Sequence, residues 1–263
     1  MIINTTSMKI SINDLNKVEM FTILFQNMKS MSDLINIQFS QEKMYIQAMD
    51  SSKVSIIEIV LPNTWFSEYE CTIPVTLGIH TVILYKILSA RDKSQFINIE
   101  YDSEEDRIFF HMCSNDKSIF DRKFECPLIE IDTEIMEIPD VDYQVELSLP
   151  SANFSLLISQ LKGFGESLEF HCSETLIKLV ANTIESGSMT VEVKIDDLCS
   201  FSIEEGQEVV LSFGIQYMSS ICQYHKVAED IDIKLHMESP LLIEYNLIDN
   251  GIIKYYLAPK ISD

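Results

Sequence analysis

The stretch that decides the fold is Ala48-Met49-Asp50-Ser51-Ser52-Lys53-Val54-Ser55, and it is matched by the C-terminal stretch Lys254-Tyr255-Tyr256-Leu257-Ala258-Pro259-Lys260-Ile261. Each is predicted to be a turn or tail whose apolar side chains are not required by the chain's own periodicity. Apolar side chains left at a surface usually mark an interaction site. The two stretches therefore direct the search for function toward shape and docking.

Working outward from these stretches, the chain contains a weak internal repeat with an offset of about 135 residues, the kind of self-similarity that fixes an architecture. Short apolar stretches at residues 9–12 and 146–149 precede helical runs at residues 15–28 and 154–161. Thr76-Leu77-Gly78-Ile79-His80 is expected to begin a helix that reaches Leu88. Its counterpart, Ser212-Phe213-Gly214-Ile215-Gln216, is expected to begin a helix that reaches Tyr224.

Alternating apolar and polar residues predict half-buried strands between and after the helices. The strand candidates are residues 44–47, 54–60, 96–100, 107–112, 168–171, 175–180, 189–195, 231–237 and 242–247. We therefore expect an α+β fold of two similar domains, each with two helices packed on antiparallel sheets. The expected boundaries are 1–127 for the first domain, 128–140 for a connector and 141–263 for the second. The connector pattern is equally typical of an ordinary exposed strand.

Composition limits the classes of function. A net charge of −22 argues against adhesion to DNA through a basic surface. No apolar run has the ~18 residues that a membrane helix needs, and residues 1–9 lack the features of a secretion signal, so we expect a soluble intracellular protein. The six cysteines form no CxxC pair and are expected to be free and mostly buried.

An enzyme is the competing class of function. The chain contains no GxGxxG, P-loop, HExxH or GxSxG motif. His111 with Cys113, and His171 with Cys172, are each only half of a zinc site. Acidic clusters such as Glu104-Glu105-Asp106 are typical of solvated loops. We therefore expect no catalytic residue, no metal and no cofactor.

Five segments in order make the chain resemble the sliding clamps of the proliferating cell nuclear antigen family. They are residues 49–59, 86–88, 128–139, 240–245 and 255–261. The resemblance implies a homotrimeric closed ring of DNA-clamp domains, with sheets outside and helices lining the hole. It implies a ring that encircles double-stranded DNA, tethers DNA polymerase as a processivity factor, and serves as a docking platform in DNA replication and DNA repair. An ATP-driven clamp loader would be a further partner.

The resemblance also implies which residues meet DNA. Basic candidates on or near the helices are Lys17, Lys29, Lys86, Arg91, Lys162 and Lys226. The second domain departs from the family pattern, because Leu156 and Ser159 stand where the family carries arginines. Topology supplies retention in a ring, so a sparse basic lining remains compatible with encirclement.

Client docking and subunit contact are the other implied sites. Clients would bring a short glutamine and aromatic motif into an apolar cavity beneath the connector, lined by Met49, Val54, Ile56, Met136, Ile138, Pro240, Tyr256, Ala258 and Pro259. Edge strands near residues 119–125 and 188–194 would pair between copies. Their candidate contact residues are Ile119, Arg122, Lys123, Met189, Glu192 and Lys194.

Two departures and two alternatives remain open. The segment between Gln26 and Phe39 is longer than in the family, and we expect it to extend the first helix or its loop. The clamp fold might instead serve as a scaffold for transcription or repair, or as one subunit of a heterotrimer. The expected location is the nucleus, or a cytoplasmic replication site if the chain is virus-encoded.

Overall fold

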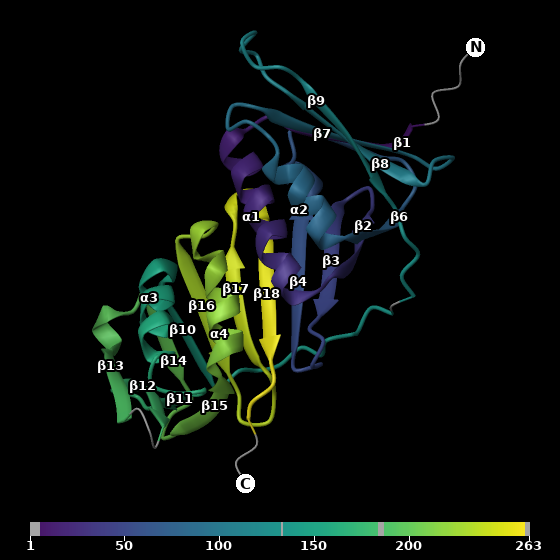
Figure 1. Cartoon of the computed structure of the whole chain (residues 1–263). Coiled ribbons are helices and arrows are strands. Elements are labelled where there is room, and N and C mark those ends of the chain that lie inside the picture. Colours follow the sequence, from purple (N-terminus) through teal and green to yellow (C-terminus); the bar gives the residue numbers. More distant parts are fainter. Residues whose placement is uncertain (1–5, 133, 184–186, 261–263) are drawn as a thin grey trace, which may run out of the picture. The chain divides into compact units, whose positions relative to one another are not determined.

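The computed structural model describes residues 6–132, 134–183 and 187–260, and the chain divides into two compact units. Unit 1 comprises Met1–Ser51, Glu58–Ile135 and Ile248–Ile252, and unit 2 comprises Ser52–Ile57, Met136–Leu247 and Ile253–Asp263. The uncertain residues at both ends, at 133 and at 184–186 lie outside this description. Each unit is built from helices and antiparallel strands (Figure 1).

The two halves of the described chain have the same order of elements, which confirms the predicted internal repeat. The first half contains β1 (Thr6–Ile12), α1 (Leu15–Met31), β2 (Leu34–Phe39), β3 (Lys43–Met49), β4 (Ser55–Pro62), the 3-10 turn η1 (Asn63–Trp65), β5 (Glu68–Cys71), β6 (Val75–His80), α2 (Thr81–Ser89), β7 (Phe96–Asp102), β8 (Arg107–Cys113) and β9 (Arg122–Pro127).

The second half contains β10 (Val145–Pro150), α3 (Ser151–Leu161), β11 (Ser167–Cys172), β12 (Leu176–Thr183), β13 (Gly187–Lys194), η2 (Ile195–Asp197), β14 (Ser200–Ile203), β15 (Val209–Gly214), α4 (Ile215–Ile221), η3 (Cys222–Lys226), β16 (Asp230–Leu235), β17 (Leu241–Asn246), η4 (Ile248–Asn250) and β18 (Ile252–Leu257). The α+β fold with two helices in each half is therefore as predicted.

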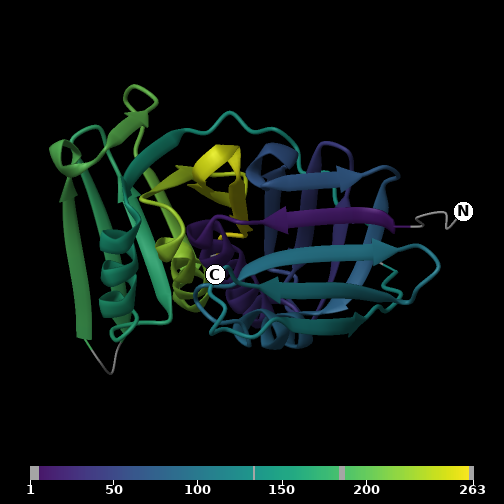
Figure 2. The ribbon, with the colours of Figure 1, turned by 90° about the horizontal axis from the view of Figure 1, so that it is seen from above.

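Unit 1 has two antiparallel sheets. One has the order β5-β1-β7-β8-β9, and Figure 2 shows β1 (purple) between β5 and β7. The other contains β3, β2 and β6 in that order, with the unit 1 part of β4 beside β3. Along β2 and β3 every second side chain is buried, as expected for strands with one face toward a core.

Helix α1 shows why the local sequence forms a helix. Asp14 caps its start, because its Oδ1 accepts hydrogen bonds from the backbone N–H groups of Asn16 (2.8 Å) and Lys17 (3.2 Å). Phe21 and Phe25 lie on its buried face, with ring centroids 4.9 Å apart. The helix continues to Met31, so the extra residues noted in the sequence lengthen α1, as one of the two expectations stated.

Unit 2 repeats this arrangement with its own core. One sheet has the order β13-β12-β11-β15, and strands β14, β10, β16, β17 and β18 follow one another in a second sheet. Phe154 of α3 and Tyr245 of β17 are fully buried. The Tyr245 hydroxyl donates a hydrogen bond of 3.2 Å to the Ile221 carbonyl at the end of α4, which ties that helix to the sheet.

Three sequence expectations about element boundaries are wrong. The expected helix start at residues 76–80 is strand β6, and that at residues 212–214 is the end of β15, so α2 and α4 begin at Thr81 and Ile215. Short apolar runs do not distinguish strand from helix, and here pairing with β2 and β11 decides. The supposed tail includes β18, which extends to Leu257.

Candidate functional site

The helix face of unit 1 presents two exposed basic residues among the predicted DNA contacts. Lys29 lies in the last turn of α1, with its Nζ 4.3 Å from the ring centroid of Tyr85 on α2. Lys86 lies on the exposed side of α2. A cation held over an aromatic ring keeps its charge while losing some of its freedom. Both ammonium groups are therefore positioned to meet an anionic ligand.

Lys17 lies elsewhere than predicted, because its ammonium group is buried. The residue is 9% exposed, and Nζ donates a hydrogen bond of 2.6 Å to the Trp65 carbonyl. The same Nζ is 2.5 Å from Oδ2 of Asp249 and 5.4 Å from the Trp65 ring centroid. An ammonium engaged in this way is a poor candidate for a phosphate contact. The expectation of a solvent-facing charge does not fit Lys17.

Arg91 departs from its predicted role in the same way. Its side chain is 5% exposed, and its guanidinium forms an ion pair with Glu19 on α1. Its Nε donates a hydrogen bond of 3.3 Å to the Thr22 hydroxyl. The guanidinium therefore ties the end of α2 to α1, and its charge is largely matched inside the protein.

The helices of unit 2 present fewer basic groups. Lys162 follows α3, and its Nζ is 3.4 Å from the Ser219 hydroxyl of α4. Lys226 ends η3 and is exposed. Leu156 on α3 is 58% exposed, so an apolar side chain faces solvent where the family resemblance would place a basic one. The sparse basic character predicted from the sequence is thus present at the surface.

Most of the predicted docking residues lie in unit 2. The Ala258 N–H donates a hydrogen bond of 3.0 Å to the Val54 carbonyl, which holds the two stretches quoted first side by side. Ile56 and Tyr256 are half-exposed, and Met136 is 46% exposed. The other docking candidates are half-buried or exposed: Val54, Ile138, Pro240, Ala258 and Pro259. Met49, at the end of β3, belongs to unit 1 and is half-exposed.

A charged cluster in the same sheet of unit 2 escaped the sequence analysis. Glu244 is only 9% exposed, and its carboxylate oxygens lie 3.0 Å from Lys234 Nζ and 3.4 Å from Lys254 Nζ. Lys234 also pairs with Glu146 at 3.4 Å. Burial lowers the pKa of Lys234, but the hydrogen bonds and charges of Glu244 and Glu146 outweigh burial and raise that pKa. The detectable sign was one acidic residue inside the apolar run Leu241–Asn246.

The connector begins with a close backbone contact in unit 1. The Ile129 N–H donates a hydrogen bond of 3.0 Å to the Gly78 carbonyl on β6, and Asn36 Nδ2 donates one of 3.1 Å to the Ile131 carbonyl. A Cβ at residue 78 would lie 2.2 Å from the Ile129 oxygen, so only glycine permits this approach. Beyond this bridge the described residues through 140 have no strand, and Figure 2 shows the segment extended.

Each unit has one predicted interface strand at the edge of a sheet. Strand β9 is the last strand of β5-β1-β7-β8-β9, and β13 is the first of β13-β12-β11-β15. Arg122 and Lys123 lie on β9, and Met189, Glu192 and Lys194 lie on β13. Ile119 precedes β9 in a turn, so the first edge strand begins later than expected.

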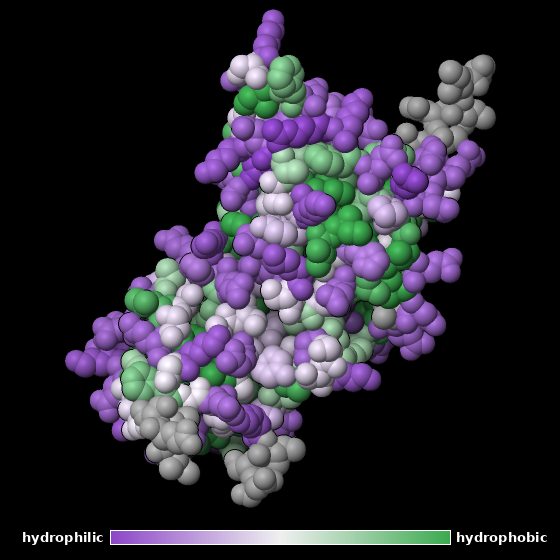
Figure 3. Space-filling model, in the orientation of Figure 1, coloured by the Kyte–Doolittle hydropathy of each residue, from purple (hydrophilic) through white to green (hydrophobic). Residues whose placement is uncertain are grey.

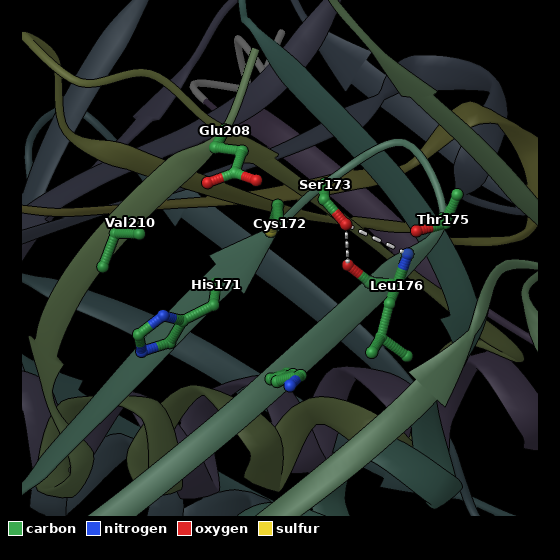
Figure 4. A pocket seen from close by; sticks show the side chains of 8 residues that line it. His171, Cys172, Ser173, Thr175, Leu176, Glu208 and Val210 are labelled. Carbon is green, nitrogen blue, oxygen red and sulfur yellow. Dashed lines mark hydrogen bonds between the residues drawn. The ribbon is translucent and has the colours of Figure 1, made fainter. Parts of the chain in front are cut away.

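Other surface features provide no catalytic geometry. A hollow of about 340 Å³ is lined by residues from β11, β12 and β15, including His171, Lys178 and Glu208 (Figure 4). Its His171 is 3.0 Å from Glu169, and none of the predicted site residues lines it. Within the described ranges, no three His, Cys, Asp or Glu side chains form a metal-binding group. None of the helices described is long and apolar enough to span a membrane.

Comparisons with known proteins cover nearly the whole chain. Residues 7–135 match "Proliferating cell nuclear antigen, N-terminal domain", and residues 137–260 match "Proliferating cell nuclear antigen, C-terminal domain". The chain is 28% identical over 251 residues to Proliferating cell nuclear antigen of Saccharomyces cerevisiae, covering 94% of this chain and 96% of that protein.

Two further relatives give the same result. Identity is 30% over 224 residues to Proliferating cell nuclear antigen 2 of Drosophila melanogaster, covering 85% and 87% of the two chains. It is 27% over 256 residues to Proliferating cell nuclear antigen of Chaetomium thermophilum, covering 94% and 98%.

Proposed function

Since this chain belongs to the proliferating cell nuclear antigen family, we propose that it is a DNA sliding clamp, a ring that tethers DNA polymerase to duplex DNA. The observation that carries the proposal is the match of both family domains, in order, to two halves with the same order of elements. Its role is that of a non-catalytic platform. Retention by enclosure makes rebinding intramolecular, which raises the effective concentration of the polymerase at the template.

The ring forms by head-to-tail contact of three copies. A head-to-tail interface uses two different surfaces of each copy and closes when the rotation between neighbours permits. Strands β9 and β13 supply two such surfaces, one in each unit, and each is an edge strand. Unpaired edges are ready to pair with another chain. The domain boundaries we propose are 1–127, 128–140 and 141–263.

The DNA faces the helices of the ring. Lys29, Lys86, Lys162 and Lys226 are exposed and provide the basic contacts. Lys17 and Arg91 support the helices instead, because protein groups hold their charges. The net charge of −22 is compatible with this role, since net charge governs nonspecific binding and not the local potential.

Clients dock on the surface that includes Val54, Ile56, Met136, Ile138 and Tyr256. The half-exposed apolar side chains there fit the aromatic groups of a short glutamine and aromatic motif. Methionine adapts to different partners. The neighbouring pair of Glu244 and Lys254 adds a polar border to the same sheet. A clamp loader and replication or repair proteins are the expected partners, acting in the nucleus.

Two measurements test the proposed function. Light scattering at micromolar concentration is expected to give the mass of three copies, and a persistent monomer would contradict the ring. After loading, circular DNA is expected to retain the clamp, whereas linear DNA loses it from its ends. Equal retention on both DNAs would show adhesion in place of enclosure.

A further inference from the structure

Phe120, in the loop between β8 and β9, is the most exposed large apolar side chain in the described part of the protein, at 84%. Its backbone is nevertheless held in place. Gln95 is fully buried, and its Nε2 donates hydrogen bonds to the carbonyls of Phe120 (3.0 Å) and Met112 (3.2 Å). The preceding turn is closed by the Ile119 N–H, which donates to the Asp116 carbonyl at 3.0 Å. An aromatic ring is thus presented to solvent on an ordered backbone.

The position of Phe120 relates it to the apolar side of the sheet. On β9, Arg122 and Phe124 pair with the buried Met112 and Phe110 of β8. Side chains alternate along extended backbone, so Phe120 falls on the same side as Phe124. Figure 3 shows apolar side chains at the surface of this loop among hydrophilic ones. Phe120 therefore continues the apolar side of the five-stranded sheet beyond its edge.

Strand β13 in unit 2 has an apolar row that is incompletely covered. Met189, Val191 and Val193 are half-exposed, although their partners on β12 are buried. Ile195, just after the strand, is also half-exposed. A row of this kind is left open because no described strand covers the outer side of β13. It offers an apolar surface of the width of an aromatic ring and a strand.

The charges near these two edges are complementary in one direction only. Exposed Lys117, Arg122 and Lys123 surround Phe120. The acids of that loop are engaged locally, since Asp116 accepts from Ser118 at 2.9 Å and Asp121 lies 3.3 Å from His111.

The C-terminal end of β13 and the turn after it have an acidic excess. Glu192, Asp196 and Asp197 are exposed there, with Lys194 the one base between them. Antiparallel pairing of β9 with β13 brings the basic end to the acidic end. Parallel pairing would instead place the basic residues opposite the uncharged Gly187, Ser188 and Met189.

We propose that Phe120 is the anchor of the contact between copies of this chain, burying its ring against Val193 and Ile195 of the next copy in an antiparallel β9–β13 pairing. This inference rests on the proposed ring and names the residue on which its closure depends. Interface energy concentrates in a few buried aromatic or arginine anchors. A side chain ordered before binding loses less freedom on association. The partner that fits this surface is a second copy of this chain.

The first test is Phe120→Ala, measured as oligomer dissociation on dilution by mass photometry. The concentration for half-dissociation is expected to rise about 10-fold to 1,000-fold, the range for loss of an interface anchor. Phe120→Leu is expected to retain most of the affinity. The matched control is Ile73→Ala, which removes a side chain 68% exposed beside β5, the other edge of the same sheet. Circular dichroism should show unchanged folding for all three variants, because both side chains face solvent.

The second test locates the partner surface. Phe120→Cys combined with Ile195→Cys, in a background with Cys113→Ser and Cys199→Ser, is expected to give cross-linked dimers and trimers on mild oxidation. Ile73→Cys combined with Ile195→Cys should give none. A monomeric wild type would overturn the ring itself. A trimeric wild type that Phe120→Ala leaves unchanged, or a Phe120 and Ile195 pair that does not cross-link, would overturn this inference alone.

Discussion

Replacing Lys17 with methionine separates a structural role from a DNA contact. Methionine preserves much of the length of the side chain and removes its charge. In the folded protein the Lys17 ammonium donates to the Trp65 carbonyl at 2.6 Å and pairs with Asp249 at 2.5 Å. Asp249 has left-handed backbone (φ 52°), a conformation that Asp tolerates better than most residues. The substitution therefore leaves a buried carbonyl without its donor.

The contacts set the size of the effect. A hydrogen bond to a charged donor contributes about 1.5–3 kcal/mol, and an unsatisfied buried acceptor carries a similar cost. The ion pair adds less than about 1 kcal/mol, because the Asp249 side chain is 56% exposed and solvent screens it. We expect Lys17→Met to lower the free energy of unfolding by about 2–4 kcal/mol.

The assay is urea unfolding followed by tryptophan fluorescence. Trp65 is the only tryptophan of the chain, and its ring lies 5.4 Å from the Lys17 ammonium. Lys86→Met is the matched control, since Lys86 is exposed on α2. It should leave stability within about 0.5 kcal/mol, as surface substitutions usually do.

DNA binding provides the second readout. Each lost phosphate contact lowers the slope of log affinity against log salt by about 0.9. That slope should fall for Lys86→Met and stay unchanged for Lys17→Met. An unchanged urea midpoint together with a reduced salt slope for Lys17→Met would refute the structural role and restore Lys17 as a DNA contact.

Three further expectations concern docking, the connector and the thiols. Tyr256→Ala should weaken binding of a client peptide by about 1–3 kcal/mol in calorimetry, and unchanged affinity would remove that residue from the site. Gly78→Ala should destabilise unit 1 by about 1–3 kcal/mol and speed proteolysis of the connector, because the new Cβ would lie 2.2 Å from the Ile129 oxygen. At pH 8 a thiol reagent should modify exposed Cys199 much faster than Cys172, since burial raises the pKa of Cys172 to about 12 and keeps the reactive thiolate scarce; equal rates would contradict this burial.

The local pattern of the chain predicted most elements, with errors where the pattern is ambiguous. The run from Leu15 was readable as a helix because its apolar residues recur at helical spacing and Asp14 caps it. The segment before Thr81 was not, because a short apolar run fits a strand or a buried helix equally well. Pairing of β6 with β2 decided in favour of the strand. The extent of β18 likewise depended on its partners.

The candidate sites divide in the same way. Residues such as Val54 and Ala258 were recognisable from the sequence because they belong to stretches characteristic of a family. Their hydrogen bond, however, joins segments far apart in the chain. The ion pairs of Glu244 with Lys234 and Lys254 left only a faint trace in the sequence, since each strand alone shows one isolated charge.

By itself the sequence determined that this protein is a duplicated α+β chain of a known family, because repeats, periodicity and characteristic stretches are local properties of the order of residues. The tertiary structure alone decided which basic groups remain available. Lys17 and Arg91 look like surface cations in the sequence, but Trp65, Asp249, Glu19 and Thr22 surround them in the fold. Burial and charge pairing depend on neighbours in space, and chain position does not reveal those neighbours.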